Sequence, residues 1–301
     1  MKTRIVFIAL LMASSLSLAA EKQQTMDNSK TMTEIRGMFG MVPTFLREFP
    51  PEALPGAWED FKSIQLSPNT ALEPKIKELI GLAVASQIPC RYCVYFHRKA
   101  ATFHGAKTAE LNFAIAVSAS VRRWSNYLYG TQQDMTGFKM DVDRFVKSMK
   151  NPPQGKENVV VTDAASAYKD MENSIGFVPN FMKAYPESGI AGAWNEFKAV
   201  EMNPNTVLNA KTKDLIGLAV SSQIPCQYCV YAGTEFAKAD GATAQEIKEA
   251  VAMAGIVRHW STVLNGLHQD EKAFEKEVDQ IFKHLERGKN LAPKKVSYKE
   301  E

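Results

Sequence analysis

Apolar residues recur at helical spacing through most of the chain, and no segment shows the strict alternation that is typical of a strand. The helix expected over residues 74–87 begins with a proline, which suits a first helical turn. One face of this helix carries Ile76, Leu79 and Ile80, and the opposite face is apolar as well, so the helix should be buried on all sides. The pattern therefore predicts an all-α fold.

One acidic residue interrupts this apolar helix. Glu78 lies one turn before Gly81 and Leu82, so its side chain is expected to point into the protein. Buried carboxylates are rare unless they are paired or take part in chemistry. Both a structural hydrogen-bonding role and a chemical role remain open for Glu78 at this point.

The segment that follows begins with a proline and leads into a second helix. Pro89 places Cys90 at or near the N-terminus of this helix, which is expected to run to about Phe103 and to stop near Gly105. A short helix is expected within the proline-bounded segment 41–50. Further helices are expected over residues 31–39, 53–64, 108–129 and 134–149.

The chain contains an internal repeat with a constant offset. Cys226 follows Cys90 by 136 positions (226 − 90), and Trp194 follows Trp58 by the same number. The two copies align without a gap from about residue 40 to residue 287. Because this period is far longer than a solenoid repeat, it predicts two tandem helical domains related by internal duplication.

Changes in composition along the chain indicate where these two domains begin and end. We expect a signal peptide over residues 1–20, a first domain over 21–150, a linker over 151–160, a second domain over 161–287 and a disordered tail over 288–301. The linker contains paired prolines and a glycine, and the tail is lysine-rich without periodicity.

The N-terminus has the features of a secretory signal peptide. Lys2 and Arg4 precede an apolar run over residues 5–18, which is followed by Ala19 and Ala20. The prediction is an exported protein, periplasmic if the source is a Gram-negative bacterium, with no membrane association after cleavage. An uncleaved membrane anchor is the alternative.

Charge excludes one class of partner. The formal net charge is +3 over 301 residues, and basic and acidic residues are interspersed. Such a surface gives no indication of nucleic-acid binding.

The four cysteines form two C-x-x-C pairs, Cys90 with Cys93 and Cys226 with Cys229. Cysteines of exported proteins ordinarily form structural disulfides. Each of these pairs closes only a very short loop, which constrains the unfolded chain little. The spacing therefore favours a redox couple, with an inert disulfide as the alternative.

In the first repeat, Cys90, Cys93 and His97 share one face of the expected helix. The thiolate is the reactive form of cysteine, and a helix N-terminus and a histidine one turn on both favour it. Glu78 on the preceding helix would position the histidine or take its proton if the two helices pack antiparallel. The acid, the histidine and the second cysteine would then form a proton relay.

These residues also carry a resemblance. The order Glu78, eleven residues, Cys90-x-x-Cys93, three residues, His97 and a Gly-Ala turn at 105–106 resembles the alkylhydroperoxidase D-like, carboxymuconolactone decarboxylase superfamily. The resemblance covers essentially the whole mature chain as two tandem domains. The segments VPTFL (42–46) and VPNFM (178–182) resemble the family as well.

The resemblance implies an all-helical fold that usually oligomerises, so a homo-oligomer is a possibility. It also implies a thiol peroxidase or disulfide reductase in which Cys93 attacks a peroxide and Cys90 resolves the sulfenic acid to a disulfide. His97 and Glu78 would move the proton. No cofactor or metal is implied, and the expected partners are a peroxide or disulfide substrate and an unidentified thiol reductant protein.

Two features locate the chain within the superfamily. Redox members often carry a further histidine between the cysteines, and here Tyr92 occupies that region, so the role of that histidine is lost or replaced. Decarboxylase members do not rely on the cysteine pair, so its presence favours the redox branch.

The second repeat departs from this pattern. It keeps Cys226 and Cys229, but Asp214 replaces the glutamate and Gly233 replaces the histidine. We expect a second, weaker redox pair that reacts slowly with peroxide. The second repeat would be either a degenerate packing partner or a second cysteine pair that exchanges electrons with the first.

Two other classes of function remain. Cys90, Cys93 and His97 could supply three ligands to zinc, although one short helix wraps an ion poorly and the second repeat lacks the histidine. The chain could also be a non-catalytic helical interaction protein with structural C-x-x-C disulfides.

Overall fold

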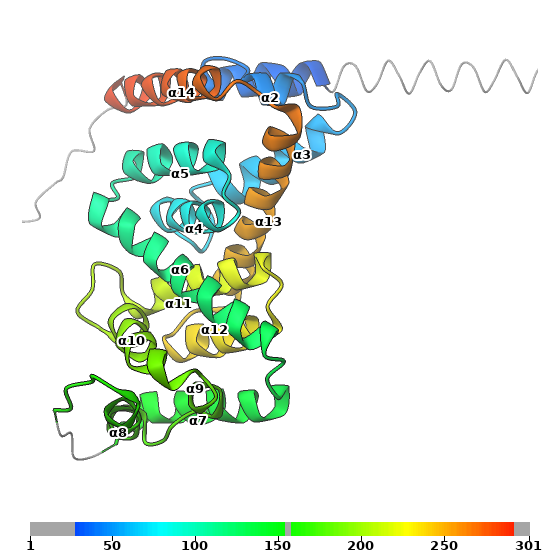
Figure 1. Ribbon diagram of the computed structural model, residues 1–301. Coiled ribbons are helices and arrows are strands. Elements are labelled where there is room, and N and C mark those ends of the chain that lie inside the picture. Colours follow the sequence, from blue (N-terminus) through cyan, green and yellow to red (C-terminus); the bar gives the residue numbers. More distant parts are fainter. Residues whose placement is uncertain (1–27, 154–157, 292–301) are drawn as a thin grey trace, which may run out of the picture. The chain divides into compact units, whose positions relative to one another are not determined.

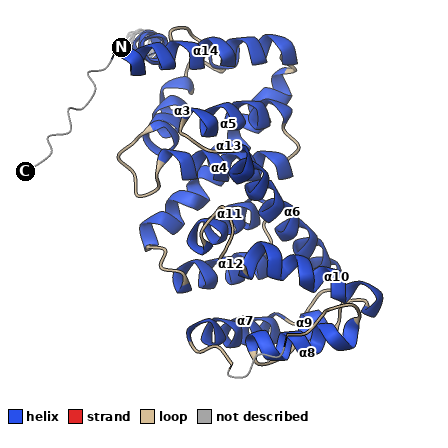
Figure 2. Ribbon diagram, turned by 90° about the vertical axis from the view of Figure 1, so that its left-hand side faces the viewer, coloured by secondary structure: helices blue, strands red, loops and turns tan. Residues whose placement is uncertain are grey.

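The computed structural model describes residues 28–153 and 158–291 (Figure 1). All regular elements within these ranges are helical, with no strand (Figure 2). The prediction of an all-α fold is therefore confirmed. The predicted signal peptide lies outside the described residues.

The helices of the two repeats follow one another in the same order. The first repeat contains a helix over residues 28–39, α2 (Thr44–Arg47), α3 (Leu54–Asp60), the π-helical segment η1 (Phe61–Leu66), α4 (Pro74–Gln87), α5 (Arg91–Phe103), α6 (Thr108–Gly130) and α7 (Met135–Lys150). The second contains α8 (Ala164–Ile175), α9 (Asn180–Lys183), α10 (Glu187–Phe197), the π-helical segment η2 (Lys198–Met202), α11 (Ala210–Gln223), α12 (Gln227–Ala239), α13 (Ala244–Leu267) and α14 (Glu271–Leu291).

Local sequence explains where several helices begin and end. Pro74 opens α4, and Cys90 is the N-cap residue of α5, as the sequence predicts. The carboxylate of Asp134 caps α7 by accepting hydrogen bonds from two backbone N–H groups. Gly176 ends α8 in the left-handed conformation, with φ of 82°, which glycine adopts without steric cost.

The described residues form two compact units, which do not coincide with the two repeats. One unit contains residues 64–262, and the other contains 28–63 together with 263–291. In the larger unit α4 packs against α5, α6 and α11, and every residue from 77 to 85 is buried. This complete burial matches the apolar character of all faces of α4.

The last helix of the second repeat packs against the beginning of the first repeat, inside the smaller unit. Glu277 of α14 accepts hydrogen bonds from the backbone N–H and the hydroxyl of Thr44, at 3.0 Å and 2.5 Å. The rings of Phe45 and Phe274 lie beside each other, with centroids 6.1 Å apart. A helix from one repeat thus completes the packing of the other.

The larger unit contains the equivalent contact with the repeats reversed. Asp141 of α7 accepts a hydrogen bond of 2.6 Å from the backbone N–H of Asn180 in α9, and Phe138 packs against Phe181. All four residues are related to the preceding contact by the offset of 136 positions. The last helix of each repeat therefore packs against the other repeat. The sequence pattern does not predict this exchange.

One predicted boundary is corrected. Helix α14 runs to Leu291, beyond the limit set at 287 for the second domain. Lys289 lies in its last turn, where a positive charge is favourable, so the lysine-rich composition extends the helix at this point. Residues 292–301 of the predicted tail lie outside the described residues.

In the part of the chain that the structure describes, no helix has the length and apolar character needed to cross a bilayer.

Candidate active site

The first C-x-x-C pair lies at the start of α5. Cys90 and Cys93 form a disulfide, with their Cα atoms 5.3 Å apart, and both side chains are buried. The Sγ atom of Cys90 accepts a hydrogen bond of 3.2 Å from the backbone N–H of Cys93. This N–H and the helix N-terminus would stabilise negative charge on sulfur when the disulfide is opened.

The predicted acid–histidine pair is present one turn further along α5. His97 Nδ1 lies 2.6 Å from Glu78 Oε2, and both side chains are buried. The other oxygen of Glu78 accepts a hydrogen bond of 3.1 Å from the side-chain amide of Gln65. Both carboxylate oxygens are thus paired, and the carboxylate fixes the orientation of the imidazole ring.

A glycine makes room for this imidazole. A Cβ atom added to Gly81 of α4 would lie 2.3 Å from His97 Nδ1, which is closer than two such atoms can approach. Gly81 therefore lets the ring lie directly against the backbone of α4. Sequence reasoning noted this glycine only as part of an apolar face.

A buried lysine of α4 binds the segment that precedes this helix in the sequence. The ammonium group of Lys77 donates hydrogen bonds to the carbonyls of Ile64 and Ser67 and to the hydroxyl of Thr70, at 2.8, 2.6 and 2.9 Å. Burial lowers the pKa of Lys77, while the neighbouring charge of Glu78 opposes this shift. The lysine ties the end of η1 to the helix that carries the acid.

The second repeat has the same cysteine geometry without a histidine. Cys226 and Cys229 form a disulfide with a Cα separation of 5.3 Å, and Cys226 Sγ accepts a hydrogen bond from the N–H of Cys229. Gly233 occupies the position of the histidine, so Asp214 has no imidazole to orient. Of the two described C-x-x-C sites, the first has an acid paired with a histidine and the second has a glycine at the position of that histidine.

Three carboxyl groups lie close together at the second site, where Glu78 is the acid of the first. Burial raises the pKa of Asp214 to about 9, and a hydrogen bond with Asp240 adds to this rise. Burial also raises the pKa of Glu201 to about 7, against the lowering effect of a hydrogen bond with Ser120. Glu201 stands where the first repeat has Gln65.

Sequence reasoning missed these supporting residues, although comparing the repeats position by position exposes some of them. The offset of 136 pairs Gln65 with Glu201, a change from a neutral to an acidic side chain. The same offset pairs Lys77 with Lys213, two lysines inside otherwise apolar helices. Ser120 carries no such signal, because it contacts the second site from a helix of the first repeat.

The described side chains offer no metal-binding cluster. Across residues 28–153 and 158–291, no group of three or more histidine, cysteine, aspartate and glutamate side chains is arranged to hold an ion. Cys90 and Cys93, which the zinc alternative requires as thiolates, are joined in a disulfide.

The fold and this site define a helical protein that carries disulfide-bonded C-x-x-C pairs, one of them beside a buried acid–histidine pair. The sequence profile of the carboxymuconolactone decarboxylase family matches residues 52–132 and 189–271, and the chain belongs to this family. The two matches lie in the two repeats, so the family resemblance and its tandem arrangement are confirmed.

A solved structure has a similar fold. A crystal structure from Burkholderia xenovorans LB400, described as a gamma-carboxymuconolactone decarboxylase subunit, is similar with a TM-score of 0.51 and 17% identity. The likeness covers 87% of this chain and 98% of that chain, and at this identity it concerns the fold alone. Among curated proteins, no sequence matches this chain.

Proposed function

We propose that the first repeat is a thiol-dependent oxidoreductase that reduces peroxides, or disulfides, through Cys90 and Cys93. The observation that carries the proposal is the buried hydrogen bond between His97 and Glu78, one helical turn after Cys93. A structural C-x-x-C disulfide has no need of such a pair. Family membership is compatible with this redox chemistry.

In the peroxide reaction, the Cys93 thiolate attacks one peroxide oxygen. An S–O bond forms and the O–O bond breaks, so that sulfur is oxidised to a sulfenic acid and the peroxide leaves as an alkoxide. The hydrogen bond with Glu78 favours a proton on Nδ1 of His97, which leaves Nε2 to accept the thiol proton and pass it to the alkoxide. The products are an alcohol and the oxidised Cys93.

The second step closes the disulfide. Cys90 attacks the sulfenic sulfur of Cys93, an S–S bond forms, and hydroxide leaves and is protonated to water. A thiol reductant protein must then return two electrons to the disulfide, because a bacterial periplasm does not reduce it unaided. Disulfide reduction uses the same residues, with the Cys93 thiolate attacking a substrate sulfur in place of oxygen.

Replacing one cysteine in each repeat tests the assignment. In a single turnover of the reduced protein with cumene hydroperoxide, Cys93→Ser should lower peroxide consumption by about 100-fold or more, because it removes the attacking thiolate. Cys229→Ser should keep most of the rate. A single turnover needs no physiological donor, and peroxide loss is followed directly by rapid quenching.

Three outcomes would contradict the proposal. Equal losses in Cys93→Ser and Cys229→Ser would remove the difference between the repeats. A reduced protein that consumes neither peroxide nor a small dialkyl disulfide would favour the non-catalytic alternative. Stoichiometric zinc in the purified reduced protein, lost in Cys93→Ser, would favour the metal-binding alternative.

Export and assembly belong to the same proposal. The proposed site works after cleavage of residues 1–20, in a compartment where a dedicated thiol protein supplies electrons, and the mature chain associates with further copies. The mass of the protein recovered from the periplasm of a Gram-negative host tests cleavage. Light scattering of the mature chain tests assembly, and a monomer would contradict it.

A further inference from the structure

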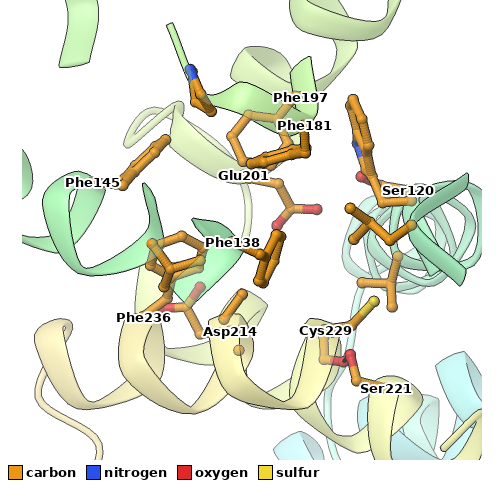
Figure 3. A pocket seen from close by; sticks show the side chains of 18 of the residues that line it. Ser120, Phe138, Phe145, Phe181, Phe197, Glu201, Asp214, Ser221, Cys229 and Phe236 are labelled. Atoms are coloured by element: carbon orange, nitrogen blue, oxygen red, sulfur yellow. Dashed lines mark hydrogen bonds between the residues drawn. The ribbon is translucent and has the colours of Figure 1, made fainter. Parts of the chain in front are cut away.

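The second site contains a cavity of about 110 Å³ beside Cys229 (Figure 3). Its walls are aromatic and its polar groups are few. Glu201 and Asp214 of the second repeat and Asp141 of α7 are the carboxylic acids in its lining, and Ser120 contributes a hydroxyl from α6. The aromatic wall consists of Trp124, Phe138, Phe145, Phe181, Phe197 and Phe236.

The cavity has a local cause in the sequence. At the first site, the imidazole of His97 lies against Gly81, within 2.3 Å of where a Cβ atom would be. At the second site, Gly233 provides no ring, and a Cβ atom added to Gly217 would meet its nearest neighbour, Val121, only at 3.5 Å. The second site therefore lacks the ring. Val121 approaches Gly217 only to ordinary van der Waals distance, and Gly233 lies close to the backbone of Leu218, so these residues bound the cavity in place of an imidazole.

Two polar atoms that line this cavity lack partners. Asp214 Oδ2 and Trp124 Nε1 are buried, and neither has a hydrogen-bond partner among the described residues. More than nine tenths of buried polar groups in folded proteins are paired. An unpaired acceptor and an unpaired N–H donor that line one cavity indicate that a bound molecule supplies their partner.

The charge states of the polar residues that line the cavity limit the class of ligand that it can bind. With its pKa raised to about 9, the Asp214 carboxyl is uncharged at neutral pH. It is hydrogen-bonded to Asp240, and its Oδ2 atom remains as an acceptor for a ligand. Lys213 is occupied, since its ammonium group donates to the carbonyls of Glu201 and Asn203, each at 2.9 Å. Glu201, with a pKa of about 7, is partly ionised at neutral pH and is hydrogen-bonded to Ser120. Asp141 accepts hydrogen bonds from Asn180. Asp214 is therefore the carboxyl group that offers an uncharged contact to a ligand.

We infer that the second repeat binds a small uncharged aromatic compound with one hydroxyl or carbonyl group, the ring against the phenylalanine wall and the oxygen facing Asp214 and Trp124. The volume of about 110 Å³ is below that of the apolar cavity of about 150 Å³ that accommodates benzene, so the site admits no more than a single ring. Aromatic walls hold such a ring by edge-to-face contacts. This binding role is independent of the redox function proposed for the first repeat.

Fluorine NMR of 4-fluorophenol with the oxidised mature protein tests the inference. Saturable binding with a dissociation constant of about 1 mM or below is expected, which is reasonable for a ligand of this size. Gly233→His refills the cavity with the residue of the first repeat and should weaken binding at least tenfold. Lys238→His adds a histidine to an exposed position of the same helix and should leave binding unchanged.

A second readout uses the cysteines themselves. Cys229 lines the cavity, so a bound phenol should slow reduction of the Cys226–Cys229 disulfide by a phosphine, measured by alkylation and mass spectrometry. Reduction of Cys90–Cys93 in the same sample is the internal control and should be unchanged. If Gly233→His does not fold, Ala232→Leu narrows the cavity from the same helix and decides the question.

Several results would overturn the inference. No saturable binding of 4-fluorophenol, or binding that is unchanged in both Gly233→His and Ala232→Leu, would exclude the cavity as the site. Tighter binding of benzylamine or benzoate than of phenol would show that the site selects a charged ligand.

One result would support the inference. Weaker binding in Asp214→Asn together with unchanged binding in Glu201→Gln would identify Asp214 as the principal polar contact.

Discussion

The position of the His97 imidazole depends on the lack of a side chain at Gly81. Gly81 has no Cβ, and the ring occupies the space that this atom would fill. In an ordinary helix interior, alanine is more stable than glycine by up to about 1 kcal/mol, so a glycine in the middle of a fully buried helix has a local cost. At this position the cost is offset by the pairing of His97 with Glu78.

Gly81→Ala should therefore lower activity although alanine favours the helical conformation. The added methyl group displaces the imidazole from Glu78, and peroxide consumption in a single turnover should fall by about 100-fold, while the Cys90–Cys93 disulfide still forms. Gly255→Ala in α13 is the control, because no described atom lies within 4 Å of its added Cβ. Equal activity of both variants would show that His97 does not need its present position.

Reactivity of the reduced cysteines gives a second prediction at this scale. The rate of alkylation at Cys93, resolved by mass spectrometry, should reach half its maximum well below the free-cysteine value of about pH 8.5, because His97 and the N-terminus of α5 favour the thiolate. His97→Asn should move the midpoint upward. A midpoint that equals that of Cys229 and does not move in His97→Asn would contradict activation by the relay.

The π-helical segments η1 and η2 are the elements that distinguish the two sites. Each precedes a buried helix and carries the residue that faces its acid, Gln65 in η1 and Glu201 in η2. A π-turn inserts one residue into a helix and re-aims the side chains that follow, and such turns are frequent at functional sites. The sequence pattern over residues 53–64 predicts one continuous helix and misses this change.

The carboxyl groups at the second site give a pH prediction. The pKa of Asp214 is about 9 in the folded protein and near its ordinary value of 3.8 when unfolded. Between these values only the unfolded state releases the proton, so the free energy of unfolding should fall as pH rises from about 4 to about 9. Below this range the carboxyl is protonated in both states and the slope disappears.

Asp214→Asn should remove part of this slope. At about pH 8 the variant should unfold at a temperature at least about 2 °C above that of the parent, and the two should converge near pH 4. Glu172→Gln, an exposed acid of α8, is the control. A parent protein whose thermal stability is flat from pH 5 to 9, or a variant with the same slope, would contradict the raised pKa.

At the scale of elements, the sequence predicts most of what local rules determine. Pro74 and Cys90 mark helix starts as predicted, because capping and backbone preference act over a few residues. The pairing of Glu78 with His97 is also predictable, since an acid in an apolar helix needs a partner. Gln65 and Lys77 were missed because their partners lie across a turn whose path is set by packing.

For the whole molecule, the exchange of α7 and α14 has the largest consequence for stability. Asp141 with Asn180 and Glu277 with Thr44 are equivalent contacts, each joining one repeat to the other inside a compact unit. No pattern within one repeat predicts this exchange, because each last helix is amphipathic whichever repeat receives its apolar face.

Cleavage of the linker tests the exchange. With a protease site placed within residues 151–160, the two halves should still co-elute on size exclusion after complete cleavage. Helices α7 and α14 each pack against the other half, and α4 and α6 also pack against α11. Phe274→Ala should loosen the association, since removing a buried phenylalanine costs about 3–5 kcal/mol. Separation of the halves of the unmodified cleaved protein would show that the exchanged helices do not hold them.

The exchanged helices also bear on how the two sites can change over evolutionary time. A duplicated half that loses its histidine would ordinarily be dispensable, and deletion would remove it at no cost. Here deletion of the second half would take α14 away from Thr44 and Phe45, so the first half would lose part of its own packing. Loss of the second repeat would therefore destabilise the first, so packing constrains the helices of the second repeat more than its cysteine site.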